Sequence, residues 1–199
     1  MKKAKRLRIL FIGNSHTYYN DLPILVAERA REEGYDCDVT MIAHGGWYLS
    51  QHTEEPDVWF NIAYGRYDYV VLQEHSHPFG PAEKLNEAVK VLNAWIRDAG
   101  AKTVIYATWS KKDEPEKQKE MDIAFRNIAE ETGAILAPVG ESWWTYQRSY
   151  PNLDLYADDG AHAAFAGSDF AAKHIWVAIR TDLYRAKLRE KQLAEKDQP

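Results

Sequence analysis

The stretch from Arg8 to Thr17, Arg-Ile-Leu-Phe-Ile-Gly-Asn-Ser-His-Thr, decides how this chain folds. Its apolar run predicts a buried strand over residues 8–13 that delivers Ser15 into solvent. Gly13 lets the backbone bend sharply at the end of that strand. A serine in this place lies where the first strand of an open α/β sheet passes into a helix, and ligands bind at that edge.

The composition sets limits on the class of protein. The chain has 199 residues, of which 45% are hydrophobic and 28% charged, as expected for one soluble globular domain. The formal net charge of -5 argues against binding to nucleic acid or to an anionic membrane. The single cysteine, Cys37, excludes a disulfide within one chain. No stretch approaches the roughly 20 apolar residues of a membrane span.

The first residues, Met1 to Arg6, are basic, as in the charged region of a secretion signal. The apolar run that follows is short, contains Arg8 and ends in the glycine-serine turn, unlike a signal sequence. We therefore expect a cytoplasmic protein as the sequence is written. A periplasmic or secreted protein is the alternative if an upstream signal has been removed.

Apolar runs alternate with helical patterns along the chain, which predicts a parallel sheet with helices on both faces. We expect a flavodoxin-like three-layer α/β/α sandwich with a five-stranded parallel sheet in the order 2-1-3-4-5. Residues 1–185 are expected to form one domain, and the charged tail 186–199 to fray into solvent. The strands are expected at 8–13, 37–43, 69–72, 103–107 and 134–138, and the helices near 21–34, 58–63, 81–100, 121–133, 143–144 and 170–183.

Ser15 has two distant candidate partners, Asp159 and His162. Residues three apart in a turn lie on the same side, so the carboxylate can hold one imidazole nitrogen and leave the other for the serine hydroxyl. This set is the minimum that turns a hydroxyl into a nucleophile. Alternatively, Asp159 caps the following helix, His162 lies on the surface and Ser15 is only a turn residue. Asp158 is a competing carboxylate.

Gly46 and Gln73 are candidate donors to an oxyanion, together with the backbone N–H of Ser15. Gly46 follows the second strand and Gln73 the third, so the expected strand order places both beside Ser15. Backbone N–H groups and side-chain amides are the donors that stabilise a tetrahedral oxyanion. Alternatively, the double glycine is a plain turn and Gln73 satisfies the end of a strand.

Several further residues are candidates for lining a cleft. They are Asn14, His16, Trp47, His75 and Trp109. Aromatic side chains near the proposed site either fill the core or offer a surface for stacking on a sugar or an acyl group. A metal site at His75 and His77 is conceivable, but their spacing is not a known ligand motif and we predict a loop that lines the cleft.

At these positions the chain resembles the SGNH hydrolases, also called the GDSL esterase and lipase superfamily. Gly13-Asn14-Ser15 matches the first block, usually Gly-Asp-Ser, and Gly46 matches the glycine of the second. Asp159-Gly160-Ala161-His162 matches the last block, Asp-x-x-His. The resemblance spans Ile9 to about Ala172. It implies a flavodoxin-like fold, with Ser15 as nucleophile, His162 as base and Asp159 as the residue that orients it.

The third block departs from the family pattern. The superfamily usually has Gly-x-Asn-Asp there, whereas this chain has Leu72-Gln73-Glu74. This resembles the Gln-Gly-Glu version of some carbohydrate acetyl esterases. It closely resembles a bacterial branch with Gly-Asn-Ser, Leu-Gln-Glu and Thr-Trp after the fourth strand, here Thr108-Trp109. By that match Gln73 replaces the asparagine donor.

Together these features predict a serine esterase that needs no metal or cofactor and removes acetyl or another short acyl group from a carbohydrate. The expected partner is a small-molecule or carbohydrate ester. One alternative is a lipase or thioesterase that acts on longer acyl chains. Another is a glycan-binding module that keeps the fold without the chemistry. The sequence does not determine the oligomeric state.

Overall fold

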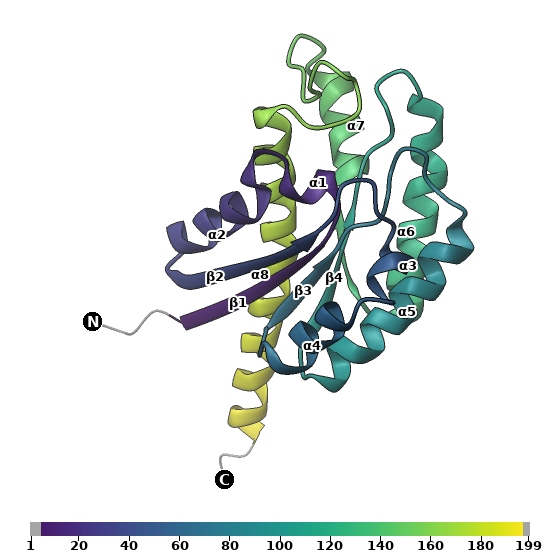
Figure 1. Cartoon of the computed structure of the whole chain (residues 1–199). Coiled ribbons are helices and arrows are strands. Elements are labelled where there is room, and N and C mark those ends of the chain that lie inside the picture. The colour runs from purple at the N-terminus through teal and green to yellow at the C-terminus, as the bar shows by residue number, and fades with distance from the viewer. Residues whose placement is uncertain (1–4, 197–199) are drawn as a thin grey trace.

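The computed structural model describes residues 5–196, which are built around a five-stranded parallel sheet. The strand order is β2-β1-β3-β4-β5, which confirms the predicted fold class. Figure 1 shows helices on both faces of the sheet, with α2 and α8 on one side and α5 and α6 on the other. The strands are β1 (Lys5–Gly13), β2 (Tyr35–Ala43), β3 (Tyr69–Leu72), β4 (Lys102–Ala107) and β5 (Ile135–Pro138).

The helices follow the strands in regular alternation. In chain order they are α1 (Ser15–Tyr18), the short 3₁₀ turn η1 (Tyr19–Asp21), α2 (Leu22–Glu32), α3 (Leu49–His52), α4 (Pro56–Tyr64), α5 (Ala82–Asp98), the 3₁₀ turn η2 (Pro115–Lys117), α6 (Gln118–Thr132), α7 (Val139–Ser149) and α8 (Phe165–Lys196).

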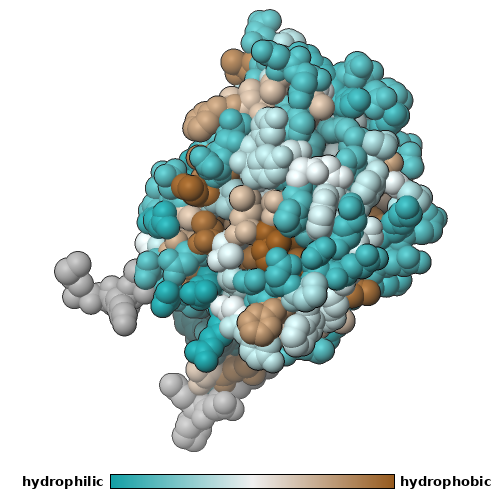
Figure 2. Space-filling view, in the orientation of Figure 1, coloured by the Kyte–Doolittle hydropathy of each residue, from teal (hydrophilic) through white to brown (hydrophobic). Residues whose placement is uncertain are grey.

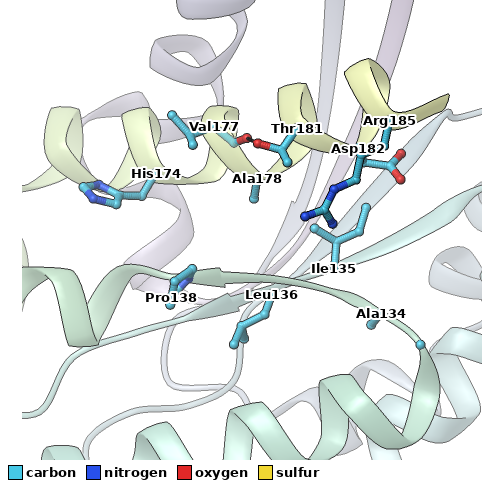
Figure 3. A pocket seen from close by; sticks show the side chains of 11 residues that line it. Ala134, Ile135, Leu136, Pro138, His174, Val177, Ala178, Thr181, Asp182 and Arg185 are labelled. Atoms are coloured by element: carbon cyan, nitrogen blue, oxygen red, sulfur yellow. Dashed lines mark hydrogen bonds between the residues drawn. The ribbon is translucent and has the colours of Figure 1, made fainter. Parts of the chain in front are cut away.

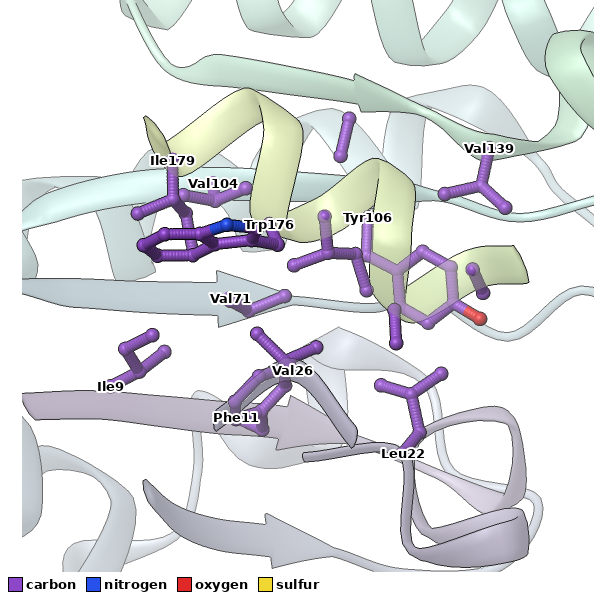
Figure 4. Packing of buried hydrophobic residues seen from close by; sticks show 14 of the residues in the cluster. Ile9, Phe11, Leu22, Val26, Val71, Val104, Tyr106, Val139, Trp176 and Ile179 are labelled. Atoms are coloured by element: carbon purple, nitrogen blue, oxygen red, sulfur yellow. The ribbon is translucent and has the colours of Figure 1, made fainter. Parts of the chain in front are cut away.

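β1 lies between β2 and β3, and side chains that alternate along it enter two separate cores. Ile9 and Phe11 pack into the core beneath α2 and α8, as Figure 4 shows. Leu10 and Ile12 enter the core beneath α3, α4, α5 and α6. Because successive side chains of a strand point to opposite faces, one continuous apolar run anchors both layers. This double anchoring fixes the end of β1, where Ser15 follows.

Four short elements were not expected from the sequence. They are α1, η1, α3 and η2, each only three or four residues long. Such segments are too short to show a helical period, which explains why pattern reasoning does not find them. α2 begins at Leu22, close to the prediction, but Asp21 makes no capping bond through its side chain and adopts a left-handed conformation with φ of 54°.

The expectation that the tail beyond Arg185 frays is wrong for the described residues. α8 continues to Lys196. Residues 186–196 are almost entirely good helix formers, and Lys191 lies 3.9 Å from Glu195 one turn later. High helix propensity therefore sustains the helix although few apolar side chains are left to pack. Residues 1–4 and 197–199, at the two expected terminal segments, lie outside the described residues.

The surface drawn in Figure 2 is mainly polar, with apolar side chains scattered over it. Over residues 5–196, no helix combines the length and the apolar character that crossing a membrane would require.

Gly140 offers a test of how tightly α7 packs on the segment after β4. A Cβ at this position would lie 2.1 Å from the backbone oxygen of Thr108. Alanine favours helix by about 1 kcal/mol over glycine, but overpacking typically costs about 1–3 kcal/mol. A clash with backbone cannot be relieved by a rotamer change, so we expect Gly140→Ala to lower the free energy of unfolding by about 2 kcal/mol. Urea denaturation measures this, with Thr145→Ala on the exposed face of α7 as the control. Equal or greater stability of Gly140→Ala would contradict the packing described.

Candidate active site

The turn from β1 to α1 presents Ser15 at the carboxyl edge of the sheet, and Figure 1 shows α1 directly beyond the tip of β1. Asn14 caps α1, because its side-chain oxygen accepts the His16 backbone N–H at 3.1 Å. Gly13 is required by crowding, since a Cβ there would lie 2.4 Å from Thr17 Oγ1 and 2.5 Å from Gln73 Oε1. The turn that carries the serine is therefore closely packed against Thr17 and Gln73.

Ser15, His162 and Asp159 come together as the sequence pattern predicted. His162 Nε2 lies 2.7 Å from Ser15 Oγ, and His162 Nδ1 lies 2.6 Å from Asp159 Oδ2. The other carboxylate oxygen of Asp159 accepts the backbone N–H groups of Ala161 and His162, each at 2.9 Å. The competing residue, Asp158, makes none of these contacts within the described chain.

The Asp159 carboxyl is kept ionised by its hydrogen bonds. Burial opposes ionisation, but the His162 ring and the two backbone N–H groups outweigh it and lower the pKa of Asp159 to about 2. A permanent carboxylate at Nδ1 fixes the tautomer of His162, with the proton on Nδ1 and the lone pair of Nε2 facing the serine.

The loop that carries His162 is fixed through four consecutive carbonyl groups. The oxygen of Gly160 accepts the Lys112 backbone N–H at 2.9 Å, and that of Ala161 accepts Trp109 Nε1–H at 2.9 Å. The next two oxygens, of His162 and Ala163, accept the backbone N–H of Ala157 at 2.8 Å and Asn20 Nδ2–H at 3.0 Å. Three donors from two other parts of the chain, and one donor within the loop, therefore set the position of the imidazole.

Trp109 was predicted to contact substrate, but it is a buried residue whose ring N–H binds the loop of His162. Its side chain is fully buried and stacks on Trp143, with ring centroids 3.8 Å apart. The sequence pattern identified a residue that matters for the site, but assigned it to the cleft wall. Burial decides against that assignment, because a fully covered ring cannot meet a ligand.

Gln73 is buried behind the turn, where its amide is already engaged. Its Oε1 accepts the Asn14 backbone N–H at 2.9 Å and the Thr17 hydroxyl at 2.8 Å, which fixes the orientation of the amide. Its Nε2 donates to the backbone oxygen of Glu74. In this arrangement Gln73 holds the serine turn. The sequence predicted that its amide would donate to an oxyanion beside Ser15, but the bond that its Nε2 makes is to Glu74.

The loop after β2 is tied to the same turn. Asn14 Nδ2 donates to the Trp47 backbone oxygen at 2.8 Å, so the predicted ligand-lining role of Asn14 becomes a structural one. Gly46 precedes Trp47 in this loop, is exposed and has φ of 75°, a conformation that favours glycine. Within residues 5–196 the Gly46 N–H makes no hydrogen bond, so it is free to donate.

The predicted metal alternative finds no support in the ring contacts of the histidines. His75 Nδ1 lies 2.9 Å from the Pro78 oxygen, and its ring stacks on Tyr48. His77 Nε2 lies 3.1 Å from the Trp109 oxygen. Among residues 5–196, no group of three or more histidine, cysteine or acidic side chains is arranged to hold a metal ion.

His52 was missed by sequence reasoning. It is completely buried, and its Nε2 lies 2.9 Å from the oxygen of Gly13, so it donates to the serine turn. Burial lowers its pKa, which keeps the ring neutral. Nothing in the sequence distinguishes this histidine from the exposed His44, because both lie in the same irregular segment.

A large hollow elsewhere in the structure does not belong to this site. It has a volume of about 550 Å³ and lies between β5 and α8, as Figure 3 shows. His174, Ala178 and Asp182 line it from α8, facing Ile135 and Leu136 on β5. None of the residues predicted for the site lines this hollow.

The sheet order and the serine-bearing edge define a flavodoxin-like α/β protein with a hydrogen-bonded serine, histidine and aspartate. No protein-family model matches the chain, and no curated protein matches it either. Several solved structures do match the chain. A protein from Slackia heliotrinireducens assigned as an SGNH hydrolase is 30% identical with a TM-score of 0.76, over 88% of this chain and 100% of that one. The chain therefore belongs to the SGNH hydrolase family.

More distant structures share the fold. A carbohydrate esterase family 3 protein from Talaromyces cellulolyticus is 14% identical with a TM-score of 0.72, and 90% of this chain and 99% of that chain are covered. The acetyl xylan esterase AlAXEase is 18% identical with a TM-score of 0.67, and 87% of this chain and 100% of that chain are covered.

Glu74, from the unusual third block, yields a prediction about pH. It is buried, which raises its pKa to about 7, although the N–H groups of His75 and Leu49 partly offset the burial. A raised folded-state pKa gives stability that is present below the unfolded value of about 4.5 and is lost as pH rises through about 7. Glutamine mimics the protonated form. We expect the free energy of unfolding of Glu74→Gln, relative to wild type, to rise by on the order of 2–3 kcal/mol between pH 4 and pH 8.

Denaturant titration at several pH values measures this difference. Glu83→Gln, on the exposed side of α5, is the control and should show little change across the same range. A difference between wild type and Glu74→Gln that is independent of pH would show that folding does not raise the pKa of Glu74.

Proposed function

We propose that this protein is a serine esterase that hydrolyses short acyl esters, with O-acetyl groups on carbohydrates as the substrate class. The observation that carries the proposal is the continuous contact from Ser15 Oγ to His162 Nε2 at 2.7 Å and from His162 Nδ1 to Asp159 at 2.6 Å. Nucleophile, base and orienting carboxylate are all within hydrogen-bond reach, which is the geometric requirement for an activated serine.

In the proposed reaction Ser15 Oγ attacks the ester carbonyl carbon while His162 Nε2 takes the hydroxyl proton. His162 then gives that proton to the leaving alcohol, and the acyl group stays on Ser15. Water attacks the acyl-serine with His162 again as base, which releases the acid and restores the serine. Asp159 stays ionised throughout, in keeping with its pKa of about 2, and stabilises the imidazolium.

We assign the oxyanion site to the backbone N–H groups of Ser15 and Gly46. Neither group makes a hydrogen bond inside residues 5–196, and the bond from Asn14 to Trp47 ties the loop of Gly46 to the serine turn. Backbone donors that are fixed before the reaction stabilise developing negative charge without reorganisation. Gln73 is not part of this assignment, because its amide is bonded to the turn itself.

Two observations favour a short acyl group on a ring-shaped alcohol. The chain neighbours of Ser15, namely Asn14, His16 and Thr17, are buried and the turn is closely packed at Gly13, which favours a short acyl group over a long one. Trp47, in the loop that is hydrogen-bonded to the serine turn, offers a half-buried ring for stacking on a sugar. Two structures of the same fold are described as an acetyl xylan esterase and a carbohydrate esterase, which agrees with this choice.

The shared mechanism predicts that losses at the triad do not add. We expect Ser15→Ala and His162→Ala each to lower kcat at least about 10³-fold, and the double variant to be no worse than either, because the residues act as a unit. A fluorophosphonate should label wild type but not Ser15→Ala. Hydrolysis of p-nitrophenyl acetate and mass spectrometry of the labelled protein give the two readings. Fully additive losses, or labelling that persists in Ser15→Ala, would contradict the assignment.

The proposed preference for short acyl groups predicts a dependence on chain length. With p-nitrophenyl esters from acetate to decanoate, we expect kcat/KM to be highest at acetate and to fall steadily. A maximum at octanoate or beyond would indicate a lipase or thioesterase. Failure to react with any ester or with fluorophosphonate, combined with binding to glycans, would indicate a binding module.

A further inference from the structure

Two aromatic rings contact the imidazole of His162. The Tyr19 ring is nearly parallel to it, with centroids 4.2 Å apart and planes inclined by 10°. The His16 ring is also stacked, at 5.0 Å and 22°. The Tyr19 and His16 rings make no contact with each other within the described chain, so they lie on opposite faces of the imidazole. We call this arrangement of Tyr19, His162 and His16 the ring clamp.

The clamp controls a degree of freedom that the hydrogen bonds leave open. Asp159 and Ser15 bind the two ring nitrogens and define the axis between them. They do not prevent the imidazole plane from rocking about that axis. A ring packed against each face does so, and the lone pair of Nε2 then stays aimed at the serine.

Tyr19 is itself held in place by a strained turn. Asn20 and Asp21, which follow it, both have φ of 54°, in the left-handed region that non-glycine residues seldom occupy. The side chain of Asn20 donates to the Ala163 oxygen at 3.0 Å and to Ser168 Oγ at 2.9 Å. Ala163 is the neighbour of His162, so the turn fixes Tyr19 relative to the imidazole.

His16 forms the inner wall of the clamp. Only 7% of its surface is exposed, and its Nδ1 is buried with no hydrogen-bond partner among residues 5–196. Burial, followed by the proximity of His77 and His162, holds the pKa of His16 well below its usual range. The ring is therefore neutral and does not repel a positive charge on His162. The rings of His16 and Trp109 meet in a T-shaped arrangement, with their centroids 5.3 Å apart.

We propose that Tyr19 is a positioning residue for His162, which holds the imidazole plane against His16 and presents an aromatic face to the positive charge that His162 acquires during the reaction. The face of a tyrosine ring carries negative charge density and attracts a cation stacked on it. The titratable groups that act on His162 are Asp159, His16 and His77. The Asp159 carboxyl is ionised because its hydrogen bonds lower its pKa, whereas burial lowers the pKa of His16 and of His77 and keeps both rings neutral. This inference rests on the proposed function, in which His162 acquires a proton during the reaction.

Kinetics test the role of the aromatic face. Tyr19→Leu keeps apolar bulk but removes the π system, and we expect kcat to fall about tenfold, which corresponds to about 1.4 kcal/mol, with KM changed by less than about threefold. Tyr19→Phe keeps the face and should stay within about twofold of wild type. Tyr184→Leu, an exposed tyrosine of α8 remote from the site, is the control. Wild-type kcat in Tyr19→Leu, or equal losses in the leucine and phenylalanine variants, would overturn the proposal.

Proton NMR tests the geometry without a substrate. A ring stacked face to face shifts the carbon-bound protons of the imidazole upfield. The signals of His162 are assigned by their absence from His162→Asn. We expect them to move downfield in Tyr19→Leu and to stay in place in Tyr19→Phe. Signals that do not move in Tyr19→Leu would show that the stacking is absent in solution.

Asn20→Gly provides an independent variant. Glycine accepts the left-handed conformation but removes both hydrogen bonds to the loop of His162. We expect the same downfield movement and a smaller loss of kcat, about threefold, because the clamp loosens while its rings remain. Unchanged signals in this variant would show that the turn does not position Tyr19.

The two readouts separate this proposal from the proposed function. If wild type hydrolyses no ester and resists fluorophosphonate, the esterase assignment fails, while the NMR result still decides whether the clamp exists. If wild type is active and Tyr19→Leu alters neither kcat nor the His162 signals, the clamp fails and the esterase assignment stands.

Discussion

The hydrogen bond between Ser15 and His162, which lie 147 positions apart in the chain, is the contact on which the rest of the site depends. Neither residue lies deep in a regular element. Ser15 opens a helix of four residues, and His162 lies in a loop between α7 and α8. The distance of 2.7 Å between them therefore requires that two irregular segments be held against one rigid sheet. The structure meets this requirement with buried polar contacts.

On the serine side buried hydrogen bonds link the turn to its surroundings. Gln73 accepts from Asn14 and Thr17, and His52 donates to the oxygen of Gly13. Buried hydrogen bonds of this kind stiffen the backbone around them. The same hydrogen bonds explain the departure in the third sequence block. The glutamine side chain accepts hydrogen bonds from the turn itself, in keeping with our proposal that backbone groups form the oxyanion site.

The fold could be predicted because its central strands are continuous apolar runs, as expected for buried parallel strands. The run Tyr69–Leu72 is apolar throughout and is observed as β3 with the expected bounds, and the sheet order follows from alternating strands and helices. The contact between Asp159 and His162 could also be predicted, since the two residues have the spacing of a turn that places both on one side. Roles that depend on burial could not be predicted from the sequence. The sequence cannot show that Trp109 is covered by Trp143, or that the Gln73 amide is already engaged.

The loop of His162 shows why such details decide the chemistry. A loop has no regular series of backbone hydrogen bonds, so contacts with other segments must fix the positions of its residues. Here four successive carbonyls, from Gly160 to Ala163, each accept a hydrogen bond, and the donors come from β1–α2, from the segment after β4 and from the loop itself. A change in any one donor leaves the other three in place. Because catalysis depends on fractions of an ångström, redundancy of this kind gives a loop the accuracy that the active site of a hydrolase requires.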